Sequence, residues 1–210
     1  QKLIGEHSDK LRILVIGKDL ELRISEKYKE RDIIELEEHP HVGASMKALF
    51  ETALRESPDI IVIEEFRGGG EAIEAVRACT RGLPGSMATA HFNSAEESIE
   101  GTGLFMLEEG LNLTLDMAKL RVARAFNIVV QMFGDSISGQ KKLTSITEVC
   151  VSDDGKITYN ELVKWKPLVA DNYLGDGNWE IVNRPTKKII NHLIKNVSID
   201  ELNELGWYVS

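Results

Sequence analysis

Short aliphatic runs alternate with helix-period patterns along the first part of the chain. Leu11–Ile16, Ile33–Leu36 and Ile60–Ile63 are runs of strand length with little polar alternation. Such runs are typical of a parallel sheet that is covered on both faces. Ala44–Arg55 carries apolar residues at helical spacing and ends before Ser57-Pro58, where a helix is disfavoured. The pattern predicts an α/β core in which Ile60–Ile63 is an inner strand.

The alternation continues to about residue 134. Glu71–Arg81, Ser94–Glu109 and Leu115–Ala125 have helical patterns. Ser86–Ala90 and Asn127–Phe133 have the length and composition of strands. We therefore expect one α/β domain over residues 1–134, with Asn127–Phe133 as one of its strands.

The pattern changes after Gly134. Lys142–Val151 and Ile157–Trp165 alternate between apolar and polar residues on either side of Asp153-Asp154-Gly155. An Asp-Gly between two alternating runs predicts a β-hairpin. Pro185–Lys195 and Ile199–Leu205 predict two short helices. Residues 135–210 are thus expected to form a C-terminal β-hairpin and a small helical tail.

Composition narrows the class of protein. The chain has 25 Lys+Arg against 34 Asp+Glu, and the resulting charge of −9 disfavours sequence-independent nucleic-acid binding. No apolar run approaches the roughly 20 residues of a membrane helix, and no signal-peptide pattern opens the chain. The two cysteines, Cys79 and Cys150, form neither a disulfide framework nor a metal-binding cluster. These features predict a soluble, cytosolic globular protein with no structural metal and no direct nucleic-acid partner.

The first segment with candidate chemistry is Pro58–Ala72. Its four aliphatic residues lead into Glu64-Glu65, which places a carboxylate at the carboxyl end of an inner parallel strand. Open α/β sheets bind ligands at this edge, and in nucleotide hydrolases such a carboxylate holds Mg²⁺ or orients the attacking water. Arg67 and Gly68–Gly70 form a turn that can approach a phosphate or a neighbouring subunit. The alternative is a core strand that simply exits into a charged surface.

The second segment is Gly85–Ser94. A short strand of small residues ends in His91, and a helix start follows at Ser94. A histidine in this place can contact a γ-phosphate, although a single histidine is also compatible with a structural role.

Together, these segments resemble the secretion ATPases of the type II/type IV superfamily, the hexameric motors of pilus assembly and conjugative transfer. The tight-adherence pilus and conjugative-transfer branch is the most similar. A third matching segment is Leu143–Val149, and the resemblance runs from about Leu11 to Trp165. It implies a RecA-like P-loop NTPase core in which the Glu65 region is the Walker B segment and Gly85–Ser94 is the His box.

The resemblance also implies roles for individual residues. Glu65 would orient water or serve Mg²⁺, and His91 would contact the γ-phosphate. The expected nucleotide- or Mg²⁺-binding residues are Glu65, Arg67, Asp19 and Glu21, and the expected inter-subunit residues are Arg67, Arg121 and Arg124. ATP and Mg²⁺ are the cofactors of the intact motor, and none is expected in this chain alone. The full-length form would be a hexameric ring on the cytoplasmic face of the bacterial inner membrane, bound to a membrane platform protein.

The chain also departs from the family pattern. The 210 residues contain no Gly-x-x-x-x-Gly-Lys-Ser/Thr sequence. The family's acidic pair falls on Gly17-Lys18, its glycine before the Walker B glutamate is Glu64, and its first His-box histidine is Leu83. We expect each of these positions to face nucleotide. The departures predict the C-terminal ATPase-domain portion of a longer motor, inactive by itself, or alternatively a degenerate homologue that acts as a non-hydrolysing assembly subunit.

Overall fold

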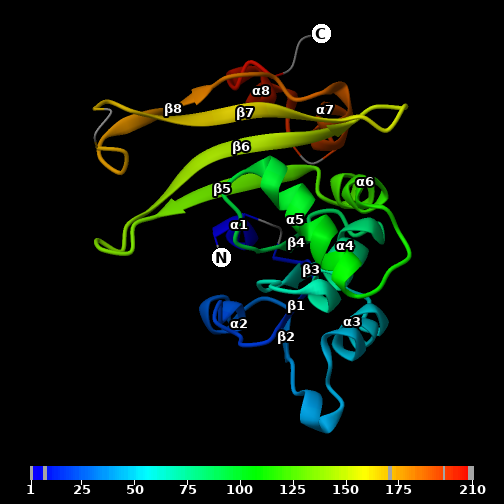
Figure 1. Ribbon diagram of the computed structural model, residues 1–210. Helices are drawn as coiled ribbons and strands as arrows, with labels where there is room; N and C mark the ends of the chain where they lie inside the picture. Colours follow the sequence, from blue (N-terminus) through cyan, green and yellow to red (C-terminus); the bar gives the residue numbers. More distant parts are fainter. Residues whose placement is uncertain (1, 7–8, 170–171, 196, 208–210) are drawn as a thin grey trace. The chain divides into compact units, whose positions relative to one another are not determined.

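The computed structural model describes residues 2–6, 9–169, 172–195 and 197–207 (Figure 1). The chain divides into two compact units: Gln1–Phe92 with Glu97–Phe126, and Asn93–Glu96 with Asn127–Ser210. Each unit contains its own four-stranded sheet. No helix in the described ranges combines the length and the apolar character that crossing a membrane requires.

The sheet of the first unit is parallel throughout. Its strands are β1 (Ile13–Gly17), β2 (Ile33–Glu37), β3 (Ile60–Ile63) and β4 (Met87–Ala88), in the order β2-β1-β3-β4. Ile16 of β1 lies opposite Leu36 of β2 and Ile63 of β3. Because the strands are parallel, their carboxyl ends meet at one edge of the sheet.

The inner strands carry the core of this unit. All residues of β1 and β3 are buried, and Ile61 and Val62 are only 0% and 1% exposed. Uninterrupted aliphatic residues need cover on both faces, and each full burial contributes about 1.5–3 kcal/mol. The prediction that Ile60–Ile63 is an inner parallel strand is confirmed.

Four longer helices accompany this sheet, and all four were expected from the sequence. α4 packs against β3 and against two of the other helices, α3 and α6. Ser45 caps α3 and Thr114 caps α6, because each hydroxyl accepts a backbone N–H of the first turn. Their bounds are α3 (Met46–Arg55), α4 (Gly69–Thr80), α5 (Ala95–Glu108) and α6 (Leu115–Ala125). Two helices of four residues, α1 (Lys2–Gly5) and α2 (Ile24–Lys27), and a 3₁₀ turn, η1 (Pro40–Val42), complete the unit.

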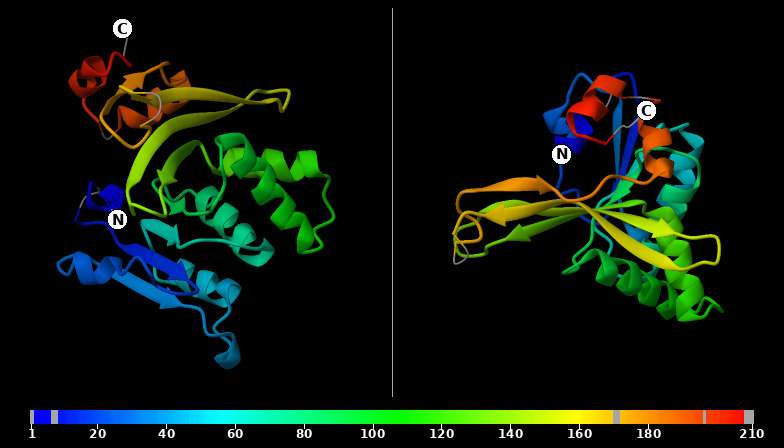
Figure 2. Two further views of the ribbon diagram at one scale, coloured as in Figure 1. Left: turned by 60° about the vertical axis from the view of Figure 1, so that its left-hand side comes forward. Right: turned by 90° about the horizontal axis from the view of Figure 1, so that it is seen from above.

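The second unit has an antiparallel sheet, which Figure 2 shows from two further directions. Its strands are β5 (Ile128–Gly134), β6 (Lys141–Val151), β7 (Ile157–Pro167) and β8 (Gly177–Ile181), in sequence order. The predicted hairpin joins β6 to β7, and Gly155 has a φ of 83° at its turn. A positive φ is easiest for glycine, which explains the Asp-Gly signal.

Two elements of this sheet differ from the sequence-based expectation. The strand at 128–134 does not join the parallel sheet; it pairs antiparallel with β6. Its side chains alternate between exposed and half-buried over much of its length, and the short turn that follows returns the chain directly, as only antiparallel pairing allows. β8 was not predicted from the sequence. It is held by pairing with β7, where Trp179 contacts Trp165 at a centroid distance of 4.7 Å.

The tail contains the two expected helices, α7 (Lys187–Leu193) and α8 (Ile199–Glu204). Ser198 and Glu201 form a capping box at the start of α8, and Leu202 is 1% exposed. The cysteines Cys79 and Cys150 are both free thiols. Desolvation of the half-buried Cys79 thiol raises its pKa to about 12.

Candidate functional site

Glu65, Arg67 and His91 meet at the carboxyl edge of the parallel sheet and form what we call the Glu65 cluster. Arg67 Nη2 donates to Glu65 Oε2 at 2.6 Å, and His91 Nε2 lies 2.8 Å from Glu65 Oε1. The Glu65 side chain is 19% exposed, whereas those of Arg67 and His91 are 64% and 87% exposed. The carboxylate is therefore enclosed by two groups that both face solvent.

The backbone at Glu65 holds an unusual conformation. Its φ is 36°, a left-handed value that is uncommon for a residue with a side chain. The N–H of Glu65 donates to Thr89 Oγ1 at 3.0 Å, and the N–H of Phe66 donates to Thr89 O at 2.9 Å. Thr89 thus fixes the turn after β3 to the segment after β4. Strain held in this way is typical of functional sites.

The cluster also sets the charge of its members. The hydrogen bond from Arg67 holds the pKa of Glu65 below its usual value, and the nearby His91 acts in the same direction. Glu65 is therefore ionised at neutral pH, the form that accepts a proton from water or binds a metal. The pKa of Arg67 is raised, first by Glu65 and more weakly by Glu21 and Asp19.

The other predicted site residues fall into two groups. Asp19 and Glu21 are exposed on the loop after β1, and their charges contribute weakly to the raised pKa of Arg67. Arg121 and Arg124 are exposed on α6. None of the hydrogen bonds and ion pairs described above for the cluster involves these two arginines. Their inter-subunit role, like the roles of the other site residues, stays a prediction.

Glu71, a residue that the sequence analysis did not single out, joins the Glu65 cluster to Lys18. Glu71 Oε2 accepts the backbone N–H of Arg67 at 2.7 Å, and Glu71 Oε1 forms an ion pair with Lys18. The Glu71 side chain is only 8% exposed, and its hydrogen bond raises the pKa of Lys18. Glu71 lies in the first turn of α4, where an acidic side chain is favourable, but its place in the sequence does not indicate the contact with Lys18.

Gly17 and Glu64, two of the positions that depart from the family pattern, are both buried, and their place relative to nucleotide stays a prediction. They lie side by side: a Cβ atom placed on Gly17 would be 3.0 Å from the Cβ of Glu64. Burial raises the pKa of Glu64, and its exposed fraction is 6%. Lys18, in contrast, is half exposed and pairs with Glu71.

The donor set fits part of a Mg²⁺–nucleotide complex. The described residues contain no group of three or more His, Cys, Asp or Glu side chains that could hold a metal by themselves. Mg²⁺ needs no such cage, since it uses one or two carboxylates together with water and phosphate oxygens. Glu65 fits that requirement, and the exposed Arg67 and His91 suit contacts with phosphate. The backbone cradle of a P-loop is not supplied by this sequence.

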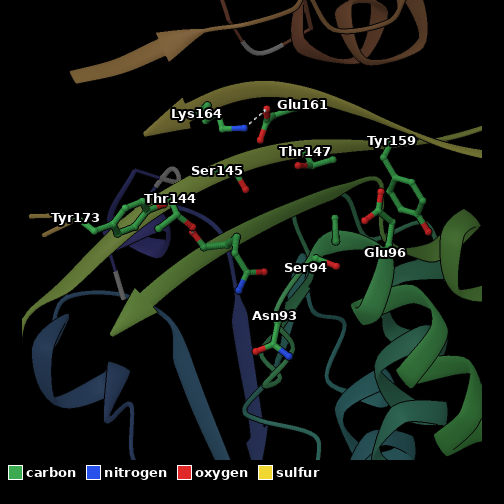
Figure 3. Close-up of a pocket in the computed structure, with 12 residues that line it drawn as sticks. Asn93, Ser94, Glu96, Thr144, Ser145, Thr147, Tyr159, Glu161, Lys164 and Tyr173 are labelled. Atoms are coloured by element: carbon green, nitrogen blue, oxygen red, sulfur yellow. Dashed lines mark hydrogen bonds and ion pairs between the residues drawn. The ribbon is translucent and has the colours of Figure 1, made fainter. Parts of the chain in front are cut away.

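Within the described residues, each unit has a hollow on its surface. A hollow of about 540 Å³ in the first unit lies beside Lys18 and Glu71, between the first turns of α3 and α4. A hollow of about 370 Å³ in the second unit is lined by polar side chains of β6 and β7 and by residues 93–96 (Figure 3). Among the described residues, its lining includes none of the predicted site residues.

The sequence matches the family model "Type II/IV secretion system protein" over residues 3–164. The chain belongs to this family.

Individual relatives agree with this assignment. The chain is 30% identical over 146 residues to the type IV secretion system protein VirB11 of Bartonella quintana (strain Toulouse) and, equally, to that of Bartonella henselae. The match covers 69% of this chain and 40% of the relatives. The crystal structure of the VirB11 ATPase from the Brucella suis type IV secretion system, in complex with sulphate, superposes with a TM-score of 0.59 at 22% identity. The match covers 70% of this chain and 43% of the VirB11 chain. The similarity confirms the RecA-like α/β fold.

Proposed function

We propose that the chain is the C-terminal ATPase-domain portion of a secretion, pilus-assembly or conjugative-transfer motor, in which ATP hydrolysis drives macromolecular transport. The observation that carries the proposal is the ionised Glu65 carboxylate between Arg67 and His91 at the edge of the parallel sheet. Membership of the secretion-protein family supports the proposal.

In this proposal Glu65 accepts a hydrogen bond from the attacking water and orients it, or takes one position on Mg²⁺. When bound, Mg²⁺ would neutralise part of the negative charge of the phosphates. Arg67 and His91 already donate to Glu65, so an arriving γ-phosphate competes for the same donors. Without nucleotide, Arg67 and His91 keep Glu65 anionic. When nucleotide is bound, they turn to the γ-phosphate, and Glu65 is free of these two contacts.

The assembly is also part of the proposal. The full-length protein would form a homo-oligomeric ring, with six subunits as the expected number, at the cytoplasmic face of the inner membrane against a platform protein. The exposed positions of Arg121 and Arg124 on α6, and of Arg67, suit contacts with the phosphates of a neighbouring subunit.

A second candidate is a non-hydrolysing assembly subunit. Gly17 and Glu64 favour it, because a buried pair replaces residues that we expected at the nucleotide. The two candidates differ in one property, which is Mg²⁺-dependent turnover.

The test is ATP hydrolysis by the product of the complete gene, measured with and without Mg²⁺ and over a range of protein concentrations. A motor gives slow Mg²⁺-dependent turnover that rises on ring assembly. His91→Ala should lower turnover about tenfold or more, within the range for loss of a positioned polar group. His41→Ala, an exposed histidine in η1, is the matched control and should leave turnover unchanged. Nucleotide binding with no turnover under any condition would favour the assembly subunit.

A further inference from the structure

Gly17 and Glu64 share a single space at the carboxyl ends of β1 and β3. The N–H of Glu64 donates to Ile16 O at 2.7 Å. Ile16 and Ile63 are paired in the sheet, so Gly17 and Glu64 directly follow a pair of neighbouring residues. A Cβ on Gly17 would lie 3.0 Å from Glu64 Cβ and 3.1 Å from Glu64 Oε2. The Glu64 side chain therefore occupies the room that a side chain at position 17 would need.

Glu64 uses this position to hold the loop that follows β1. Its Oε1 accepts the backbone N–H of Leu22, while its buried Oε2 has no hydrogen-bond partner among the described residues. An unpaired buried oxygen is unfavourable, and burial of the carboxyl adds to that cost. A side chain that only filled space would not need a carboxyl group here.

A second carboxylate fastens the same loop from the neighbouring strand. Glu35 of β2 accepts the N–H of Ile24 at 2.6 Å and the hydroxyl of Ser25 at 2.5 Å. Arg23, between the two attachment points, has a left-handed φ of 42°. The loop is thus held in a conformation that an unattached chain would leave.

The same loop carries Asp19 and Glu21, the two acidic residues that the sequence predicts to bind nucleotide or Mg²⁺. Glu21 directly precedes the attached Leu22, and Asp19 lies two residues earlier, where Glu21 N–H donates to Asp19 O at 2.7 Å. The charges of both residues act on Arg67. Fixing the Leu22 amide therefore restricts the backbone that carries these two carboxylates.

We propose that Glu64 is a positioning residue: it holds the loop at Leu22, in the space left by Gly17, and so presents Asp19 and Glu21 to the Glu65 cluster. A catalytic role for Asp19 and Glu21 rests on the proposed ATPase function. The attachment of the loop to Glu64 at Leu22 does not rest on that function. Glu64 acts through the loop and touches no substrate.

The test is amide hydrogen exchange at Leu22, measured in the complete protein by NMR or by mass spectrometry of short peptides. Glu64→Ala should speed exchange at Leu22 about tenfold or more while Ile61 and Val62 of β3 keep their protection. Glu64→Gln should restore slow exchange, because its amide oxygen can accept the same N–H. Glu74→Ala is the matched control: Glu74 is also a buried glutamate with one unpaired oxygen, and its loss should leave Leu22 unchanged.

A second variant keeps the test decisive if Glu64→Ala does not fold. Gly17→Ala should push Glu64 away without removing it, and so should also speed exchange at Leu22. The double variant Gly17→Ala/Glu64→Ala should remove the clash, so the effect of Gly17→Ala on stability should vanish in that background. Unchanged Leu22 exchange in folded Glu64→Ala or Gly17→Ala protein would overturn the proposal and leave Glu64 a packing residue.

Measurements of ATP turnover separate the catalytic role of the loop from its attachment to Glu64. If the wild-type protein hydrolyses ATP, Glu64→Ala should raise the Mg²⁺ concentration for half-maximal turnover about tenfold, and Glu64→Gln should largely restore it. If the wild-type protein does not hydrolyse ATP, the proposed function fails, and the exchange result at Leu22 still decides the role of Glu64.

Discussion

The hydroxyl of Thr89 accepts the backbone N–H of Glu65 at 3.0 Å and thereby joins the end of β3 to the end of β4. Two segments that the sequence separates by more than 20 residues are fixed to each other at the point where Glu65 takes its left-handed φ. This contact holds the backbone of Glu65, while Arg67 and His91 hold its carboxylate.

Thr89→Val should therefore lower the free energy of unfolding by about 1 kcal/mol, the typical contribution of one such hydrogen bond. Thr89→Ser keeps the hydroxyl and should lose less. Urea unfolding of the two variants measures the difference. A larger loss in Thr89→Ser than in Thr89→Val would show that the methyl group of Thr89, rather than its hydroxyl, stabilises this turn.

Arg67→Ala should raise the pKa of Glu65, because the hydrogen bond from Arg67 is the largest cause of its lowered value. A lowered folded-state pKa stabilises the protein above the unfolded value of Glu, and this contribution is lost as the pH falls through the folded value. In Arg67→Ala, the free energy of unfolding should therefore fall less steeply as the pH is lowered through the acid range. A carboxyl ¹³C NMR titration of Glu65 measures the pKa directly, with Arg77→Ala as the control. An unchanged Glu65 pKa in Arg67→Ala would contradict the prediction.

Glu74→Gln should become relatively more stable as the pH rises. Burial is the largest cause of the raised pKa of Glu74, although Arg77 on its own helix and Lys47 on α3 lower it and Glu51 on α3 raises it. The unfolded chain therefore releases this proton at a lower pH than the folded chain, so the stability of the wild type declines as pH rises from the unfolded value of 4.5. Glutamine removes that decline.

Urea unfolding of wild type and Glu74→Gln between pH 4 and pH 8 measures this effect. Glu51→Gln, an exposed residue on the facing helix, is the control and should show a much smaller pH dependence. A stability difference for Glu74→Gln that stays constant with pH would mean that Glu74 has the same pKa folded and unfolded.

Cys79 should react slowly with thiol reagents while the protein is folded. A shift of its pKa from 9.0 to about 12 lowers the thiolate fraction at pH 8 by about a thousandfold, and the thiolate is the reactive form. Labelling by Ellman's reagent in a Cys150→Ser background, with and without urea, isolates Cys79. Similar rates in the two states would show that Cys79 is accessible and ionisable in the fold.

The inner strands could be predicted from sequence because their aliphatic runs have only one stable environment, a sheet covered on both faces. The strand at 128–134 could not be assigned to its sheet in the same way, since a short apolar run does not specify its partner. β8 depends on pairing with β7 and has little local strand signal.

The candidate site also has some features that the sequence predicts and others that it does not. Glu65, Arg67 and His91 stand out through their positions after apolar strands, and their approach follows from parallel pairing. The adjacency of Gly17 and Glu64 and the contact of Glu71 with Arg67 and Lys18 arise only in three dimensions. A single sequence gives no signal for a side chain that fills a space left by a residue 47 positions away.

The central claim is that Glu65, and not its neighbour Glu64, is the working carboxylate. The most direct test compares Glu65→Gln with Glu64→Gln in the product of the complete gene, measuring ATP turnover and nucleotide binding for both. Glu65→Gln should reduce turnover by about 10²-fold or more and largely keep binding, because the amide preserves shape but cannot accept a proton. Glu64→Gln should keep most of the turnover. Full turnover in Glu65→Gln, or its loss in Glu64→Gln alone, would contradict the account.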